Sequence, residues 1–354
     1  MVSIKDVRRS NSLLTEKPSG MVAVFVGATS GIGLSTLKQV AKYSNAPKVY
    51  VVGRSKQSAT PLLHELEVLS PKGIFIFVET EISLIKNVDA VCEEIKANEQ
   101  KLDLVFVSPG FLSVEGRKET SEGIDMYSSL SFYARLRLVH NLIPLLSASL
   151  NPRVVSILAG GKEKVIDIND LELRKNYSLV NAANTAATQT TLAFEELAKS
   201  YPMISFCHVY PGLVATGIIA KFTGTFKGIW ALPAMLARWT LIPVLHRMAT
   251  TVDEAGERGL FVATSAKYPP AEPKDPQEVG VALPDGVQVA KSSVVNGGKG
   301  NGVYRIYKDS ESAENEADSI LGGYRLDQVD KRIWEQTLEV WKAALEKCDE
   351  KCES

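Results

Sequence analysis

A strand-like run that leads directly into a glycine-rich turn is the feature that most constrains the fold of this chain. Residues 22–26 are five consecutive apolar residues, three of them valine. A continuous apolar run of this length indicates a strand covered on both faces, as in a parallel sheet. The turn Gly27-Ala28-Thr29-Ser30-Gly31-Ile32-Gly33 follows, and residues 34–43 then have apolar residues at helical spacing. Glycines in such a turn let the backbone approach a pyrophosphate, whose charge lies against the helix N-terminus. The sequence therefore predicts a dinucleotide site, with a glycine turn that binds no ligand as the alternative.

Residue 54 indicates which dinucleotide is favoured. Residues 48–53 are a second predicted strand, and Arg54 follows it with Lys56 nearby and no acidic residue between them. At this position a carboxylate would bind the ribose 2′-hydroxyl of NAD, whereas a cation would bind the 2′-phosphate of NADP. Guanidinium matches phosphate geometry, so we expect NADP, with a solvated loop charge as the alternative.

Strands and helices alternate through most of the chain. Further strands are predicted at 73–78, 103–107, 153–158, 204–209 and 302–307, with helices between them. This alternation predicts an α/β fold, namely a Rossmann-like, doubly wound parallel sheet. Ligands of such sheets lie outside the carboxyl ends of the strands. We therefore expect the loops beginning at Ser108 and Tyr210 to meet the glycine turn at one site.

The predicted organisation is an N-terminal arm (1–20), a dinucleotide-binding domain (21–265), and a segment (266–354) that completes the same domain. That last segment has an irregular insertion, a last strand and a C-terminal helical extension. An apolar stretch within about 213–247 contains two prolines and Arg238, which argue against a membrane span. We expect it to form a lid over an apolar substrate; the alternatives are peripheral membrane contact and ordinary core.

Composition excludes several classes of function. The formal net charge of −1 favours no nucleic-acid partner, and residues 1–20 lack the apolar core of a secretory signal. Four scattered cysteines predict free thiols in a reducing, cytoplasmic environment, and the four histidines show no metal-ligand spacing. We expect no metal.

The glycine turn, Arg54 and one further stretch resemble the short-chain dehydrogenase/reductase superfamily. That stretch is Tyr210-Pro211-Gly212-Leu213-Val214-Ala215-Thr216-Gly217, after the sixth strand. The resemblance spans roughly residues 20–265, and the additional segments resemble a fungal subgroup linked to secondary metabolism. It implies a Rossmann-like domain, NAD(P)(H) binding, hydride transfer to or from a carbonyl or alcohol, and a homodimer.

The catalytic residues of this superfamily are not in register here. Ser108-Pro109-Gly110 stands in a loop that usually contains Asn-Ala-Gly, and Ser131 aligns with a helical asparagine. Residues 158–160 (Leu-Ala-Gly) replace the usual serine. Registering the following helix on 194–198 places Ala183 and Ala187 where the superfamily has Tyr and Lys.

The nearest alternative to that missing pair is Tyr177 with Asn181. A tyrosine acts as a general acid near neutral pH when an adjacent cation favours its ionised form, and asparagine carries no charge. We nevertheless expect Tyr177 to be the general acid, oriented by Asn181; the alternative is a tyrosine at a helix entry without a catalytic role.

The sequence thus predicts an NADP(H)-dependent short-chain oxidoreductase acting on an apolar small molecule in secondary metabolism. A redox-neutral cyclase or isomerase, or a non-catalytic NADP-sensing protein, are the alternatives. The resemblance implies the following cofactor contacts: Gly27, Thr29, Ser30, Gly31, Ile32 and Gly33 at the pyrophosphate; Arg54 at the 2′-phosphate; Glu81 at the adenine; Ser108 and Gly110 at the ribose; and Pro211, Gly212, Val214 and Thr216 at the nicotinamide.

Overall fold

A seven-stranded parallel sheet organises the protein. The computed structural model describes residues 1–110, 116–216, 249–296 and 299–352. The strand order is β3-β2-β1-β4-β5-β6-β9, and every neighbouring pair is parallel. The strands are β1 (Val22–Val26), β2 (Lys48–Gly53), β3 (Ile74–Glu79), β4 (Leu104–Val107), β5 (Arg153–Ile157), β6 (Ser205–Val209) and β9 (Val303–Ile306); β7 (Val295–Asn296) and β8 (Lys299–Gly300) form a separate antiparallel pair. The order reverses between β1 and β4, so the predicted doubly wound, Rossmann-like α/β fold is confirmed.

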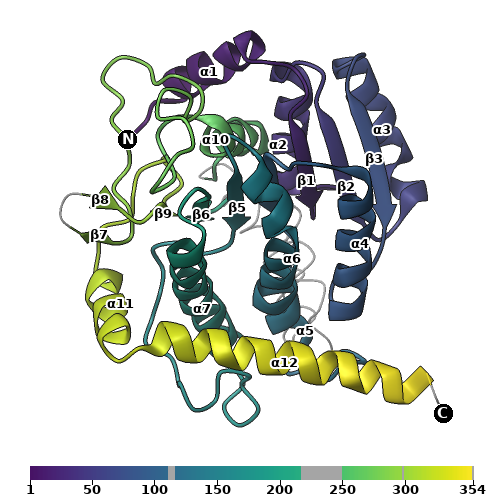
Figure 1. The fold of residues 1–354 in the computed structure, drawn as a ribbon, viewed down its shortest axis with the longest axis vertical. Helices are drawn as coiled ribbons and strands as arrows, with labels where there is room; N and C mark the ends of the chain where they lie inside the picture. Colours follow the sequence, from purple (N-terminus) through teal and green to yellow (C-terminus); the bar gives the residue numbers. More distant parts are fainter. Residues whose placement is uncertain (111–115, 217–248, 297–298, 353–354) are drawn as a thin grey trace, which may run out of the picture.

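Helices cover both faces of this sheet (Figure 1). One face carries α2 (Gly31–Tyr43), α3 (Lys56–Leu69) and α10 (Val252–Thr264), with α1 (Ile4–Ser12) and the 3₁₀ turn η1 (Leu13–Glu16) outside them. The other face carries α4 (Ile85–Asn98), α6 (Ala134–Ala148) and α7 (Leu179–Ser200). All five residues of β1 are buried because alternate side chains enter the two cores, Phe25 on one side and Val24 on the other.

The helical segment between β4 and β5 is interrupted near its start. The short α5 (Met126–Ser128) is followed by a π-helical turn, η2 (Ser129–Tyr133), and only then by α6. Pro144 lies within α6. Within this segment the carbonyl of Leu130 accepts a hydrogen bond from Arg135 Nε, five residues further on, at 2.8 Å.

Two C-terminal helices complete the described chain. The sequence indicated α12 (Val329–Cys352) but not α11 (Ala317–Leu326), which contains two adjacent glycines. A tertiary contact holds α11, since Arg325 makes two hydrogen bonds of 2.7 and 2.9 Å to Glu195 on α7. Figure 1 shows α12, in yellow, running across the helices of the α4–α6–α7 face.

Trp341 is the main anchor of α12. Its side chain is 1% exposed, contacts the rings of His140 and Trp334, and donates from Nε1 to the carbonyl of Tyr133 at 3.1 Å. We expect Trp341→Ala to lower the free energy of unfolding by about 3–5 kcal/mol, measured by urea denaturation. Leu338→Ala, on the same helix but 41% exposed, should cost only about 0.5 kcal/mol. Equal effects of the two substitutions would show that Trp341 is not the anchor.

Within the described residues, no helix is both long and apolar enough to cross a membrane. Most of the apolar stretch predicted to form a lid, residues 217–248, lies outside the described residues.

Candidate cofactor site and active site

The glycine turn touches the loop after β4 at the point where the strand order reverses. Gly27 and Gly31 have φ of +77° and +62°, a region that L side chains rarely adopt. A Cβ at Gly27 would lie 2.4 Å from the backbone nitrogen of Pro109, and one at Gly33 would lie 2.3 Å from Ser108 Oγ. Glycine is therefore required at these positions for the two loops to approach each other.

The N-terminus of α2 is left without a side-chain cap. Ser30 occupies the N-cap position in an extended conformation and makes no capping hydrogen bond, and both Thr29 and Ser30 are exposed. Thr216 lies next to Gly31, the first residue of α2, since a Cβ added at Gly31 would be 3.3 Å from the methyl carbon of Thr216. First-turn N–H groups without a capping side chain favour an anion, so this element fits a pyrophosphate.

Arg54 lies beside this element with its guanidinium largely free. Its side chain is 79% exposed, and among the described residues it forms one ion pair, between Nη1 and Glu81 Oε2 at 3.8 Å. A Cβ at Gly53 would be 3.1 Å from the methyl of Thr29, which places the end of β2 next to the glycine turn. An exposed arginine with one long ion pair can accept a phosphate partner at little cost.

The remaining predicted cofactor residues lie at the same edge of the sheet. Ser108 Oγ donates to the carbonyls of Val26 and Gly27 at 3.4 and 3.3 Å, and Gly110 is exposed. Pro211 and Ile32 line one small void of about 30 Å³. Gly212 has a φ of +69°, and the buried Val214 forms a β-bridge with Thr250. Their contacts with a cofactor stay predictions.

Tyr177 and Asn181 lie at the start of α7 without an interaction between their side chains. Asn181 is exposed, and its side chain donates to the carbonyl of Asn176 at 2.9 Å. Burial raises the pKa of Tyr177, Asp125 and Tyr127 raise it further, and Arg117 lowers it slightly. These surroundings disfavour proton release from Tyr177, although its catalytic role stays a prediction.

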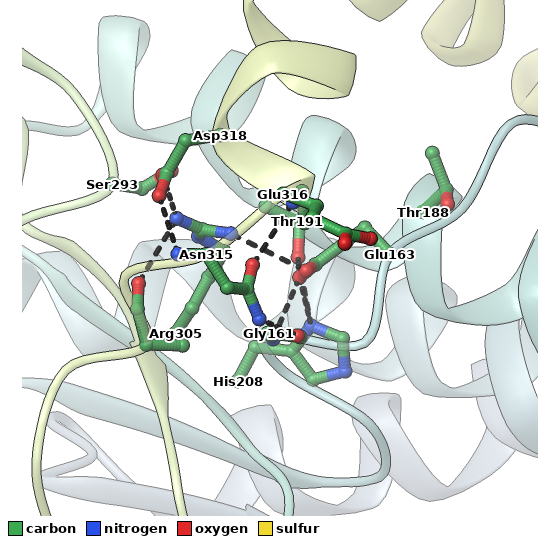
Figure 2. A network of polar contacts seen from close by, with 12 residues as sticks. Gly161, Glu163, Thr188, Thr191, His208, Ser293, Arg305, Asn315, Glu316 and Asp318 are labelled. Atoms are coloured by element: carbon green, nitrogen blue, oxygen red, sulfur yellow. Dashed lines mark hydrogen bonds and ion pairs between the residues drawn. The ribbon is translucent and has the colours of Figure 1, made fainter.

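A buried polar network supports the loop after β5 (Figure 2). His208 Nε2 accepts from the Ala159 N–H at 3.1 Å, so the ring proton is assigned to Nδ1, which donates to Thr191 Oγ1 at 2.8 Å. Thr191 in turn donates to Glu163 Oε1 at 2.6 Å. Burial, with smaller effects of Arg135 and Arg305, lowers the pKa of His208 to about 3, so its imidazole is neutral at neutral pH.

Glu163 connects this network to β9 and the C-terminal segment. Its Oε1 accepts from the Gly161 N–H at 3.0 Å, and its Oε2 lies 3.4 Å from Arg305 Nη1. Arg305 also pairs with Asp318 on α11, as Figure 2 shows. The loop after β5 is therefore held from three neighbouring elements rather than by a serine side chain of its own.

A lysine and two tyrosines meet at the carboxyl ends of β5, β6 and β9. Lys162 Nζ lies 4.9 Å from the ring centroids of both Tyr210 and Tyr307, and Lys162 forms no ion pair within the described residues. Tyr307 donates its hydroxyl proton to the carbonyl of Gly161 at 3.2 Å, whereas the Tyr210 hydroxyl has no hydrogen bond within the described part of the chain. Sequence reasoning missed this group because residues 162, 210 and 307 come together only through strand adjacency.

Known proteins resemble both the sequence and the fold. A family model described as short chain dehydrogenase matches residues 21–225. Oxidoreductase AN1596 of Emericella nidulans is 41% identical over 337 residues, which cover 95% of this chain and 97% of that protein. Oxidoreductase andH of Emericella variicolor is 37% identical and covers 97% of each chain.

Two solved structures share the fold at low sequence identity. One is a short chain dehydrogenase of Shigella flexneri complexed with NADP, with a TM-score of 0.51 and 16% identity over 72% of this chain and 93% of that one. The other is YwfH, an NADPH-dependent reductase involved in bacilysin biosynthesis, with a TM-score of 0.52 and 13% identity over 70% and 92% of the two chains. The family match includes the glycine turn, Arg54 and the Pro211-Gly212 turn, and this chain belongs to the short-chain dehydrogenase family of oxidoreductases.

Proposed function

We propose that the protein is an NADPH-dependent reductase of a carbonyl group on an apolar small molecule. The observation that carries this proposal is the exposed guanidinium of Arg54 beside the uncapped glycine turn, a combination suited to a dinucleotide with a 2′-phosphate. The NADP and NADPH named for the two similar structures are consistent with this choice. Reduced nicotinamide, when bound, supplies a hydride to a carbonyl carbon.

The chain itself must hold the cofactor and supply a proton to the carbonyl oxygen. Two tyrosines at the carboxyl edge of the sheet are candidates for the proton donor. Tyr177 was predicted from the sequence, and Tyr210 is favoured by the ammonium of Lys162 over its ring. A nearby cation stabilises the negative charge that develops on a phenol oxygen as its proton leaves. We therefore propose Tyr210 as the donor.

A redox-neutral cyclase or isomerase is the second candidate function, and a non-catalytic NADP-sensing protein is a third. Both functions are favoured by the alanines at 159, 183 and 187, because alanine provides neither the hydroxyl nor the cation that the superfamily has at these positions. An apolar substrate and a role in secondary metabolism rest on the composition of residues 213–247 and on the fungal relatives. Cytoplasmic location, a homodimer and peripheral membrane contact stay predictions.

Calorimetric titration with NADPH and with NADH tests the proposal. We expect NADPH to bind more tightly, and Arg54→Ala to weaken NADPH binding by about 10–100-fold, the usual value of a charged hydrogen bond. NADH binding should change little, because NADH lacks the 2′-phosphate.

Lys56→Ala, two residues further on, is a matched control for a general loss of positive charge. Failure of the wild-type protein to bind either nucleotide would contradict both the reductase and the NADP sensor. It would leave a redox-neutral enzyme that acts without nicotinamide.

A further inference from the structure

Arg135 places a buried cation beneath the carboxyl ends of β4 and β5. Its side chain is buried, and within the described residues its hydrogen bonds all go to uncharged oxygens. Nη1 donates to Ser156 Oγ and to the carbonyl of Ile157, at 3.0 and 2.9 Å, and lies 3.3 Å from the carbonyl of Val107. Nη2 donates to the carbonyl of Pro109. The guanidinium thus joins the ends of the two strands that follow the switch point.

No carboxylate neutralises this cation within the described residues. Burial lowers the pKa of Arg135 to about 10, so the side chain remains charged at neutral pH. The nearby Arg305, by contrast, pairs with Glu163 and Asp318, and His208 is neutral. A buried charge without a counterion is costly, and its field extends further than that of a compensated pair.

The position of Arg54 determines which half of a dinucleotide lies above Arg135. Arg54, at the end of β2, would hold the adenosine 2′-phosphate, and the N-terminus of α2 would hold the pyrophosphate. Since β4 and β5 lie on the opposite side of β1 from β2, the nicotinamide half must extend over their carboxyl ends. Those ends are where Arg135 contacts Pro109 and Ile157.

We propose that the uncompensated charge of Arg135 makes the site bind NADPH more tightly than NADP⁺. The reduced nicotinamide ring is neutral, whereas the oxidised ring carries a positive charge that Arg135 repels. In this proposal Arg135 acts through its electrostatic field and makes no contact with the cofactor, because the backbone of the loops after β4 and β5 lies between them. The inference rests on the proposed NADP(H) site and adds the preferred redox state of its ligand.

The expected size of the preference for NADPH over NADP⁺ follows from Coulomb's law. Two unit charges about 10 Å apart at an effective dielectric constant of about 20 change an equilibrium constant by about tenfold. NADP⁺ and NADPH share the adenosine, the phosphates and the riboses, so the ratio of their dissociation constants isolates the charge of the ring. Wild-type protein should bind NADPH at least about tenfold more tightly than NADP⁺.

Arg153 provides a matched control. It is also a buried arginine whose Nη1 donates to two carbonyls, those of Val262 and Ser265, and within the described residues it has no carboxylate partner. It lies at the start of β5, the opposite edge of the sheet. Arg135→Met and Arg153→Met therefore remove the same kind of group at different distances from the cofactor site.

The test is calorimetric titration of wild type, Arg135→Met, Arg135→Lys and Arg153→Met with NADPH and with NADP⁺. Arg135→Met should lower the preference for NADPH by about tenfold, mainly through tighter NADP⁺ binding. Arg135→Lys keeps the charge and should retain the preference, as should Arg153→Met. Circular dichroism checks that each variant is folded.

Three results separate the possibilities. A wild-type protein that binds NADP⁺ as tightly as NADPH overturns the inference without any variant, even if Arg135→Met fails to fold. An unchanged preference in folded Arg135→Met overturns it as well. Failure of wild type to bind either nucleotide instead contradicts the proposed function on which the inference rests.

Discussion

Replacement of Gly27 by alanine is expected to abolish NADPH binding and to lower the free energy of unfolding by about 2–5 kcal/mol. Two costs combine at this residue. Its φ of +77° is unfavourable for any L side chain, and its added Cβ would meet the backbone of Pro109 at 2.4 Å. Because the obstacle is backbone, the loop after β4 must move away from the glycine turn. Calorimetry with NADPH and urea denaturation measure the two effects.

Substitution of Gly116 separates the cost of left-handed backbone strain from the cost of the contact with Pro109. Its φ of +79° nearly equals that of Gly27, but a Cβ there would have no heavy atom within 4 Å. Gly116→Ala should cost only the left-handed strain, about 1–2 kcal/mol, and leave NADPH affinity unchanged. If Gly27→Ala behaved like Gly116→Ala, the contact between the glycine turn and the β4 loop would not be what cofactor binding requires.

Replacement of Tyr210 by phenylalanine is expected to reduce NADPH-dependent turnover by about 10²–10⁴-fold while leaving NADPH affinity unchanged. The substitution removes only the hydroxyl that has no hydrogen-bond partner within the described residues, so folding should be unaffected. Turnover is measured as NADPH oxidation with apolar aldehydes such as decanal. Lys162→Met should lower turnover in the same direction, because it removes the ammonium near the Tyr210 ring.

Phenylalanine variants of two further tyrosines show in the same assay which tyrosine is the proton donor. Tyr307→Phe leaves the same lysine in place and removes a hydroxyl that is already engaged with Gly161, so we expect a small effect. Tyr177→Phe tests the donor predicted from the sequence, whose surroundings raise its pKa. Loss of turnover in Tyr177→Phe with normal turnover in Tyr210→Phe would reverse the assignment. Normal turnover in both would remove tyrosine from the mechanism.

Local patterns were sufficient to predict the seven strands of the parallel sheet and the glycine turn after the first of them. The apolar run 22–26, the glycines at 27, 31 and 33 and the cation at 54 are each determined by short-range constraints. A fully buried strand must be apolar, a left-handed backbone requires glycine, and an exposed arginine keeps its charge available. These constraints are visible in sequence because the interacting positions are a few residues apart or follow a fixed period.

Only the tertiary structure decided how charges and hydroxyls are brought together at the carboxyl edge of the sheet. Arg135 appeared in the sequence as one residue of a long apolar helix, yet it joins the ends of two strands beneath the site. Lys162, Tyr210 and Tyr307 follow three different strands and meet because β5, β6 and β9 are neighbours. Such contacts join residues up to about 145 positions apart and have no period, so no local pattern encodes them. The sequence by itself thus determined the fold and the predicted cofactor, and strand order determined which side chains face each other there.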